Sequence, residues 1–257
     1  MSVSRVFYAV LVGLAASLSS LVSTEANADT VLGIYAGVGS WQQEVSGEVA
    51  AASLVDVDIE RDLDLEDDTN NVAYFALEHF VPGVPNLRLQ YADISSSGAN
   101  VLSRQIEFNG TTFNVNTDVV TDLDLTQTDV VLYYEVLDNW VSLDLGLMAR
   151  IVDGELVLVS STERADAEFS GALPMLYGRA RFDLPFTGGW VAADAQGVAY
   201  NGNELIDASA RIGWESPVGL GFEVGYRSWR LTLDDIDDVD SAEIDLSGPF
   251  AMLNFHF

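Results

Sequence analysis

The sequence predicts an all-β fold, a transmembrane antiparallel up-and-down β-barrel of about ten strands, from three observations. Apolar side chains recur at every second position of long segments, which is the period of a strand with one apolar face. A mean hydropathy of +0.19 coexists with a net charge of −29, which fits an apolar belt between charged ends better than a soluble globule. The first 28 residues have the layout of an export signal. Barrels of eight or twelve strands remain alternatives.

The amino-terminal segment has three parts. Arg5 gives a basic start, residues 6–22 are mainly apolar and small, and Ala26-Asn27-Ala28 is a small-x-small cleavage motif. The apolar run is shorter than the roughly 20 residues that a spanning helix needs. We therefore expect a signal peptide over 1–28, cleaved after Ala28, and a mature barrel over 29–257. The chain has no cysteine, so disulfides, thiol chemistry and lipid attachment are not expected.

Alternation along the mature chain defines ten strands, because each segment places its apolar side chains on one face. In chain order, with apolar residues of that face, they are 31–43 (Leu32, Ile34), 70–80 (Phe75, Leu77), 87–97 (Leu87, Leu89), 128–137 (Val130, Leu132), 140–152 (Leu143, Leu145), 174–184 (Leu176, Phe182), 190–199, 204–215 (Ile206, Ile212), 220–233 (Phe222, Val224) and 243–257 (Leu253, Phe255). An even number of strands is usual in single-chain bacterial barrels.

The connections alternate between short and long, except for the brief connection Asn201-Gly202-Asn203. Four short turns are expected at 81–86, 138–139, 185–189 and 216–219. The longer, acidic connections, which we expect to be extracellular loops, are about 44–69, 98–127, 153–172 and 234–242. Short periplasmic turns and longer outer loops are typical of outer-membrane barrels. Asn109-Gly110, between two apolar pairs, indicates a further hairpin above the membrane.

Several segments resemble an uncharacterised family of small proteobacterial outer-membrane β-barrel proteins. They are Leu77-Glu78-His79, LYYEVLDNWVSLDLGL at 132–147 and LPMLYGRARFDLPFTG at 173–188, and the likeness runs from about residue 31 to 257. The resemblance implies this fold and a location in the outer membrane of a Gram-negative bacterium. It implies no catalytic or ligand residues.

The last strand also resembles the terminal strand by which such barrels are recognised for insertion. Leu253, Phe255 and Phe257 would form that insertion signal. The expected partners are periplasmic chaperones and barrel-assembly machinery during insertion, then outer-membrane lipid and lipopolysaccharide. Nucleic acid is not an expected partner, because the chain is strongly acidic and has no lysine.

Carboxylates occupy every second position between residues 55 and 68, which indicates a strand with one acidic face. Hard divalent cations prefer carboxylate oxygen, so this face is a candidate Ca²⁺ or Mg²⁺ site; a plain hydrated surface is the alternative. The candidate contacts are Asp56, Asp58, Glu60, Asp62, Asp64, Glu66 and Asp68. No other cofactor is expected. Two further acidic groups, at 118–124 and 234–240, fall on the lipid-side phase, so we expect bulges near 126–128 and 248–249.

Charged residues alternate with the apolar face along the strands, so we expect them to line the lumen as a charge network. Its members are Arg88, Glu135, Asp144, Arg150, Arg179, Arg181, Asp183, Asp207, Arg211, Glu223 and Arg227, with Asp194 on the same phase. Buried charges are tolerated when they are paired. Barrels of about eight strands are filled by side chains, whereas aqueous channels need about sixteen. The sequence therefore predicts a closed or very narrow lumen.

Two other residue types bear on function. The two histidines, His79 and His256, both fall at the periplasmic end, away from an outer-rim substrate, so we expect no enzyme. A carboxylate-only site stays open. The five tryptophans fall near strand ends, which suggests interfacial girdles. The function predicted is structural or interactive, a barrel with a filled lumen presenting acidic extracellular loops. The alternatives are a narrow channel for cations or small solutes, or an outer-membrane enzyme.

Overall fold

The structure, a computed structural model, describes residues 32–51, 57–236 and 239–257, and the expected signal peptide lies outside these ranges. Its strands are β1 (Leu32–Ala51), β2 (Val57–Asp58), β3 (Asp68–His79), β4 (Asn86–Val101), β5 (Ile106–Phe108), β6 (Thr111–Phe113), β7 (Asp118–Leu137), β8 (Val141–Val159), β9 (Arg164–Asp183), β10 (Gly189–Tyr200), β11 (Asn203–Glu215), β12 (Leu220–Ile236) and β13 (Val239–His256). A π-helix, η2, covers Ile59–Leu63. No helix in the described ranges is long and apolar enough to cross a membrane.

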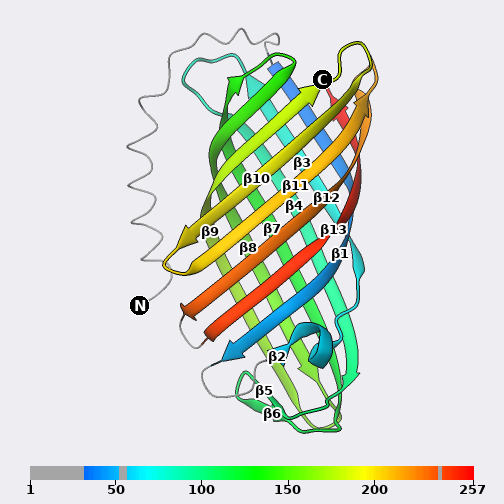
Figure 1. Ribbon diagram of the computed structural model, residues 1–257, viewed down its shortest axis with the longest axis vertical. Coiled ribbons are helices and arrows are strands. Elements are labelled where there is room, and N and C mark those ends of the chain that lie inside the picture. Colours follow the sequence, from blue (N-terminus) through cyan, green and yellow to red (C-terminus); the bar gives the residue numbers. More distant parts are fainter. Residues whose placement is uncertain (1–31, 52–56, 237–238) are drawn as a thin grey trace.

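Ten of these strands form one closed antiparallel barrel (Figure 1). Around the wall the order is β1, β3, β4, β7, β8, β9, β10, β11, β12 and β13. The ring closes because β13 pairs with β1, in a register that places Tyr35 opposite His256 and Trp41 opposite Phe250. The prediction of a ten-stranded antiparallel barrel is thus confirmed.

One end of the barrel carries the connections that follow β3, β7, β9 and β11, and we call it the turn end. They are 80–85, 138–140, 184–188 and 216–219, close to the turns that the sequence predicts. The start of β1 and the end of β13 lie at this end as well. Gly83 and Gly219 both have φ of +79°, a left-handed conformation that glycine adopts without strain.

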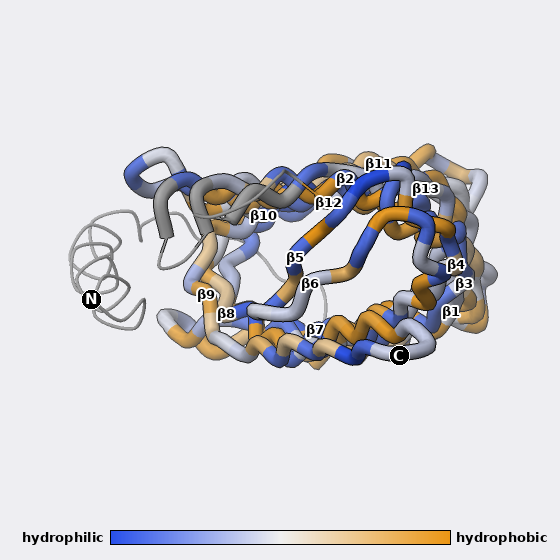
Figure 2. Tube along the Cα trace, turned by 90° about the horizontal axis from the view of Figure 1, so that it is seen from below, coloured by the Kyte–Doolittle hydropathy of each residue, from blue (hydrophilic) through white to orange (hydrophobic). Residues whose placement is uncertain are grey.

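The opposite end, which we call the cap end, has short connections at 160–163 and 201–202 and is covered by two inserted pieces. The cap segment, residues 57–66, contains β2 and η2, and the second piece is the hairpin of β5 and β6. Figure 2, which looks along the barrel, shows this hairpin running across the opening. The hairpin turns at Asn109 and Gly110, with φ of 46° and 75°, as the Asn-Gly pair predicts.

Most barrel strands are longer than a membrane requires. β1, β7 and β9 have 20 residues each, whereas a tilted spanning strand needs about 9–11. The cap-end half of the barrel therefore projects beyond the apolar belt, and residues 44–51, 118–127, 153–159 and 164–172, which were predicted as parts of loops, are strand instead. Its interior is a packed apolar core that includes Ile94, Leu102, Ile106, Phe113, Val119, Leu158 and Leu246, all buried.

The two predicted bulges are absent. β4 and β7 pair without interruption from Asn86 opposite Tyr133 to Val101 opposite Asp118. β12 and β13 likewise keep one register past Gly248 and Pro249. The bulges were expected so that Asp122 and Asp124 would avoid lipid. In the structure these residues do face outward and are exposed, but on the projecting part of β7, beyond the apolar belt.

The predicted acidic strand over 55–68 is also wrong. Only Val57 and Asp58 pair with β1, and the chain then turns through η2. Burial of Ile59, Leu63 and Leu65 stabilises the turn through η2, because these side chains join the apolar core under the cap. Gly98 of β4 permits the close approach, since a Cβ there would collide with the carbonyl oxygens of Leu63 and Asp64.

Candidate functional site in the barrel lumen

The lumen between the turn end and the apolar core is lined by charged side chains from nearly every strand. They lie there because strand positions of one parity point inward, while the other parity carries the apolar belt. Leu145, Ile212 and Phe222 are exposed on the outer wall, whereas Asp144, Arg211 and Glu223 face inward. Every residue of the predicted lumen network lies on this inward parity.

Arg150 of β8 is the centre of a first group of charges. Its side chain is fully buried, and its Nε and Nη2 atoms donate to the two carboxylate oxygens of Asp129, each at 2.9 Å. Its Nη2 also donates to Asp207 at 2.6 Å and to Gln196 at 3.0 Å. Arg227 holds the same Asp207 through its Nε and Nη2 atoms, at 2.9 and 2.6 Å.

This first group crosses the lumen from wall to wall. Asp129 is on β7 and Arg227 is on β12, the fourth and ninth strands in a ring of ten. Strands five apart in such a ring lie on opposite sides. The chain of contacts from Asp129 through Arg150 and Asp207 to Arg227 therefore bridges the barrel, with Gln127 donating to Asp129 at 3.1 Å.

A second group lies on β9–β13. Arg211 pairs with Asp194, and its Nη1 donates to Glu223 at 3.1 Å. Arg179 lies 3.9 Å from the other oxygen of Asp194. Asn254 donates to Glu223 at 3.4 Å. The carboxylates are thus shared between cations, which offsets the cost of burying each charge.

A third group lies nearer the turn end and is less tightly paired. Arg181 binds Asp183 at 2.8 Å, and the Tyr133 hydroxyl donates to Glu78 at 2.8 Å. Asn86 donates to Glu135 at 3.2 Å. Asp144 is buried but makes no direct ion pair among the described residues. The structure therefore brings most of the predicted network into contact and leaves Asp144 and Arg88 outside those contacts.

Tryptophan does not form the two girdles that strand ends suggested. Trp41, Trp190 and Trp229 are buried inside the barrel, and only Trp140 and Trp214 are exposed on the outside. Two of the buried rings make cation–π contacts with lumen arginines. The Arg227 guanidinium lies 4.6 Å from the centre of the Trp41 ring, and the Arg181 guanidinium lies 4.6 Å from the centre of the Trp190 ring.

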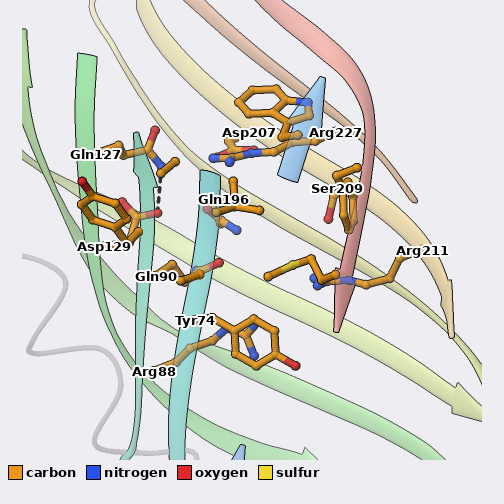
Figure 3. A pocket seen from close by; sticks show the side chains of 17 residues that line it. Tyr74, Arg88, Gln90, Gln127, Asp129, Gln196, Asp207, Ser209, Arg211 and Arg227 are labelled. Atoms are coloured by element: carbon orange, nitrogen blue, oxygen red, sulfur yellow. Dashed lines mark hydrogen bonds and ion pairs between the residues drawn. The ribbon is translucent and has the colours of Figure 1, made fainter. Parts of the chain in front are cut away.

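The lumen keeps one small cavity, of about 70 Å³, among these groups. Figure 3 shows it between Gln90 and Arg88 on one wall and Arg211 on the facing wall. Asp129, Asp207 and Arg227 also line it. A space of this size holds a few water molecules, and it is far smaller than a porin channel.

The carboxylates predicted to hold a divalent cation are dispersed. Asp62 is buried and pairs with Arg104, Asp58 pairs with Arg61 at 3.1 Å, and Glu60, Asp64, Glu66 and Asp68 are exposed. Asp56 lies outside the described residues. Across the ranges that the structure describes, no group of three or more acidic, histidine or cysteine side chains could hold a metal ion. The acidic face is lost because the segment folds as a π-helical turn.

Asp62 is the one acid of this segment that the fold buries. Burial alone would raise its pKa, but the hydrogen bonds from Arg104 and from the Asp58 amide hold the pKa below its usual range. The Arg104 Nε lies 3.2 Å from each carboxylate oxygen. This pair fastens the cap segment to the connection between β4 and β5.

Both histidines lie at the turn end. The His79 Nε2 is 3.2 Å from the Pro85 carbonyl oxygen. His256 stacks on Tyr35 with ring centres 4.1 Å apart and lies 3.1 Å from Glu215. The His79 backbone amide donates to the Asn86 side chain of the third group at 2.9 Å, whereas the two imidazole rings contact Pro85, Tyr35 and Glu215 instead of the lumen charges.

Sequence reasoning missed Gln127, Asp129, Gln196 and Glu78 as lumen residues. Gln127 and Asp129 share the inward parity of Glu135, so the alternation in β7 could have identified them. The bulge expected near 126–128 interrupted that alternation. Gln196 shares the parity of Asp194, and Glu78 that of Tyr74, on strands where the charge pattern is sparse.

Comparison with known proteins gives a likeness of fold. No family model and no curated protein matches the chain. The outer membrane protease OmpT from Escherichia coli aligns with 91% of this chain and 100% of its own, at 12% identity and a TM-score of 0.56. The translocator domain of the autotransporter NalP from Neisseria meningitidis (9% identity, 99% and 94% coverage) and Ail from Yersinia pestis (6%, 88% and 100%) have TM-scores of only 0.42 and 0.36.

Sequence identities this low do not show that two proteins share an activity, and the TM-scores of 0.42 and 0.36 are too low to support a conclusion about this chain. The alignment with OmpT, over its full length, agrees with the closed ten-stranded ring and the exposed apolar belt. The chain therefore has the fold of an outer-membrane β-barrel, as its resemblance to small proteins of that class implied.

Proposed function

We propose that the protein is a structural or interaction barrel of the outer membrane, with a filled lumen and an acidic cap end that faces outward. The observation that carries this proposal is the bridge of buried ion pairs from Asp129 to Arg227, which joins opposite walls. A conducting path would have to pass this bridge and then the apolar core under the cap. Neither the bridge nor the apolar core leaves room for a continuous column of water.

The orientation follows from the same topology. The turn end would face the periplasm and the cap end the exterior, because the two long connections, which hold the cap segment and the β5–β6 hairpin, are at the cap end, and barrels of this class have their longer connections outside. The acidic residues of the projecting strands, including Asp122, Asp124 and Asp153, would then form the outer surface. Outer-membrane lipid and lipopolysaccharide are the proposed partners, with divalent cations as bridges to the lipid phosphates.

The proposal includes no catalytic step. OmpT is named as a protease, but that activity is stated of OmpT, and the likeness reaches only the fold. In this chain His79 and His256 are at the end assigned to the periplasm. A general base there would not reach an extracellular peptide or an outer-leaflet lipid.

Single-channel recording in planar bilayers tests the filled lumen. We expect no stable conductance steps from the refolded mature protein, under conditions in which a sixteen-stranded porin gives clear steps. Stable steps with a preference for cations would instead support the narrow channel. Fractionation of cells that express the full chain tests the location, and recovery of the protein with the inner membrane would contradict the proposal.

A further inference from the structure

Arg88 differs from every other arginine in the lumen. Its side chain comes from β4 and is 3% exposed, and its guanidinium lies 4.1 Å from the centre of the Tyr74 ring. It makes no hydrogen bond and no ion pair with any described residue. Each of the others has a carboxylate partner: Arg150, Arg179, Arg181, Arg211 and Arg227. Asp144 is within electrostatic range of Arg88 but does not touch it.

Two more donors without a partner share the cavity with Arg88. The buried Nε atoms of Arg88 and Arg211 and the Nε2 atom of Gln90 have no hydrogen-bond partner in the protein. All three residues line the cavity of about 70 Å³. β4 and β11 are the third and eighth strands of the ring, so Arg88 and Arg211 face each other across it (Figure 3).

The carboxylates around this cavity are already engaged. Asp129 and Asp207 line it, but Arg150 and Arg227 hold their oxygens. Asp194 accepts from Arg211 and from the Ser209 hydroxyl. A buried cation that faces a cavity of unpartnered N–H groups is costly unless an anion or several waters complete it.

We propose that this cavity binds one small inorganic anion of halide size, with chloride as the physiological case. The donors are single N–H groups from three separate side chains. That arrangement suits a spherical ion, whereas a carboxylate or phosphate is matched by the paired N–H groups of an arginine fork. The cavity volume fits an ion with one or two waters. The ion completes the lumen charge network and joins β4 to β11.

Urea unfolding of the refolded mature protein in detergent tests this site. Sodium chloride is exchanged for sodium gluconate at constant ionic strength, because gluconate is too large for the cavity. Above saturation, each tenfold rise in chloride should lower the unfolding equilibrium constant about tenfold, and bromide should act alike. Arg88→Gln should abolish this dependence. Arg230→Gln, which removes the same charge from an exposed outer-wall pair with Asp245, should retain it.

The outcomes separate a bound ion from general salt effects. A chloride dependence of equal size in the wild type and in both variants would be a general effect of the anion on the protein surface and would overturn the proposal, as would no dependence in the wild type. Should Arg88→Gln fail to fold, the wild type decides alone. Crystals grown with bromide should give an anomalous peak between Arg88, Gln90 and Arg211, and a cavity that holds only water would refute the site.

Discussion

At the residue scale, the stability of the lumen depends on which carboxylates keep a cation. Arg150 is shared between Asp129 and Asp207, but the two are not equivalent. Asp207 also has Arg227, whereas the remaining described contact of Asp129 is the neutral amide of Gln127. Removing Arg150 therefore leaves Asp129 as a buried charge without a counter-charge.

Arg150→Leu should destabilise the barrel by about 3–5 kcal/mol, the range for breaking a buried pair from one side. The double variant Arg150→Leu with Asp129→Leu should recover much of this loss, because the charge left behind is gone and Asp207 stays paired with Arg227. Urea unfolding in detergent measures both. A double variant less stable than the single one would show that packing, and not charge, is what Arg150 supplies.

At the scale of elements, the sequence predicted strands and turns far better than the cap. Strand alternation and Gly or Pro turns are local signals, and the ten barrel strands lie near their predicted positions at the turn end. At the cap end they run further than predicted: β7 begins at Asp118 and β8 ends at Val159, where the predicted bounds were 128 and 152. The segment after Asp56 has the same two-residue alternation, yet it forms η2. The decisive contacts are distant in sequence: Ile59 and Leu63 meet a core built from other strands, and Asp62 meets Arg104. No local pattern encodes them.

The cap should loosen in acid. The pKa of Asp62 is lowered in the folded state, so its contribution to stability is complete above the ordinary Asp pKa of about 3.9 and is lost as the pH falls through the folded value. Hydrogen exchange of residues 57–66 should therefore accelerate on acidification, after correction for its intrinsic rate. Asp62→Asn should show fast exchange already at neutral pH. Equal protection in the variant and the wild type at pH 7 would contradict the role of this pair.

At the scale of the whole molecule, β7 passes from the membrane belt into the projecting cap-end half without a shift in its pairing register. In the turn-end half of β7, Leu132 and Tyr134 face outward and Asp129 faces inward. In the cap-end half the pattern is reversed, with Asp122 and Asp124 outward and Val119 and Leu125 inward. The sequence shows this reversal as acids on the lipid-side phase, which led to the expectation of a bulge. Strand length, 20 residues, allows the reversal instead.

This reversal makes the effect of an outward-facing charge depend on its height along the wall. Leu145 of β8 and Val120 of β7 are almost equally exposed, at 46% and 47%, and both point outward on neighbouring strands. Leu145 pairs with Tyr134, near the middle of the belt, whereas Val120 lies 14 residues before that tyrosine in β7, toward the cap end. At 3.3 Å per residue and a tilt near 40°, this separates them by roughly 35 Å, more than the apolar band of about 25 Å.

Leu145→Arg should therefore cost about 2–4 kcal/mol in a bilayer, the range for arginine at the midplane, while Val120→Arg should cost little. Unfolding in lipid vesicles measures the difference, and the same pair in a soluble fold would give similar values because the exposure is matched. In detergent micelles, which adapt their thickness, the gap should narrow. Equal costs in vesicles would mean that the wall of this barrel does not meet hydrocarbon at Leu145, and the assignment of its outer surface to the membrane would fail.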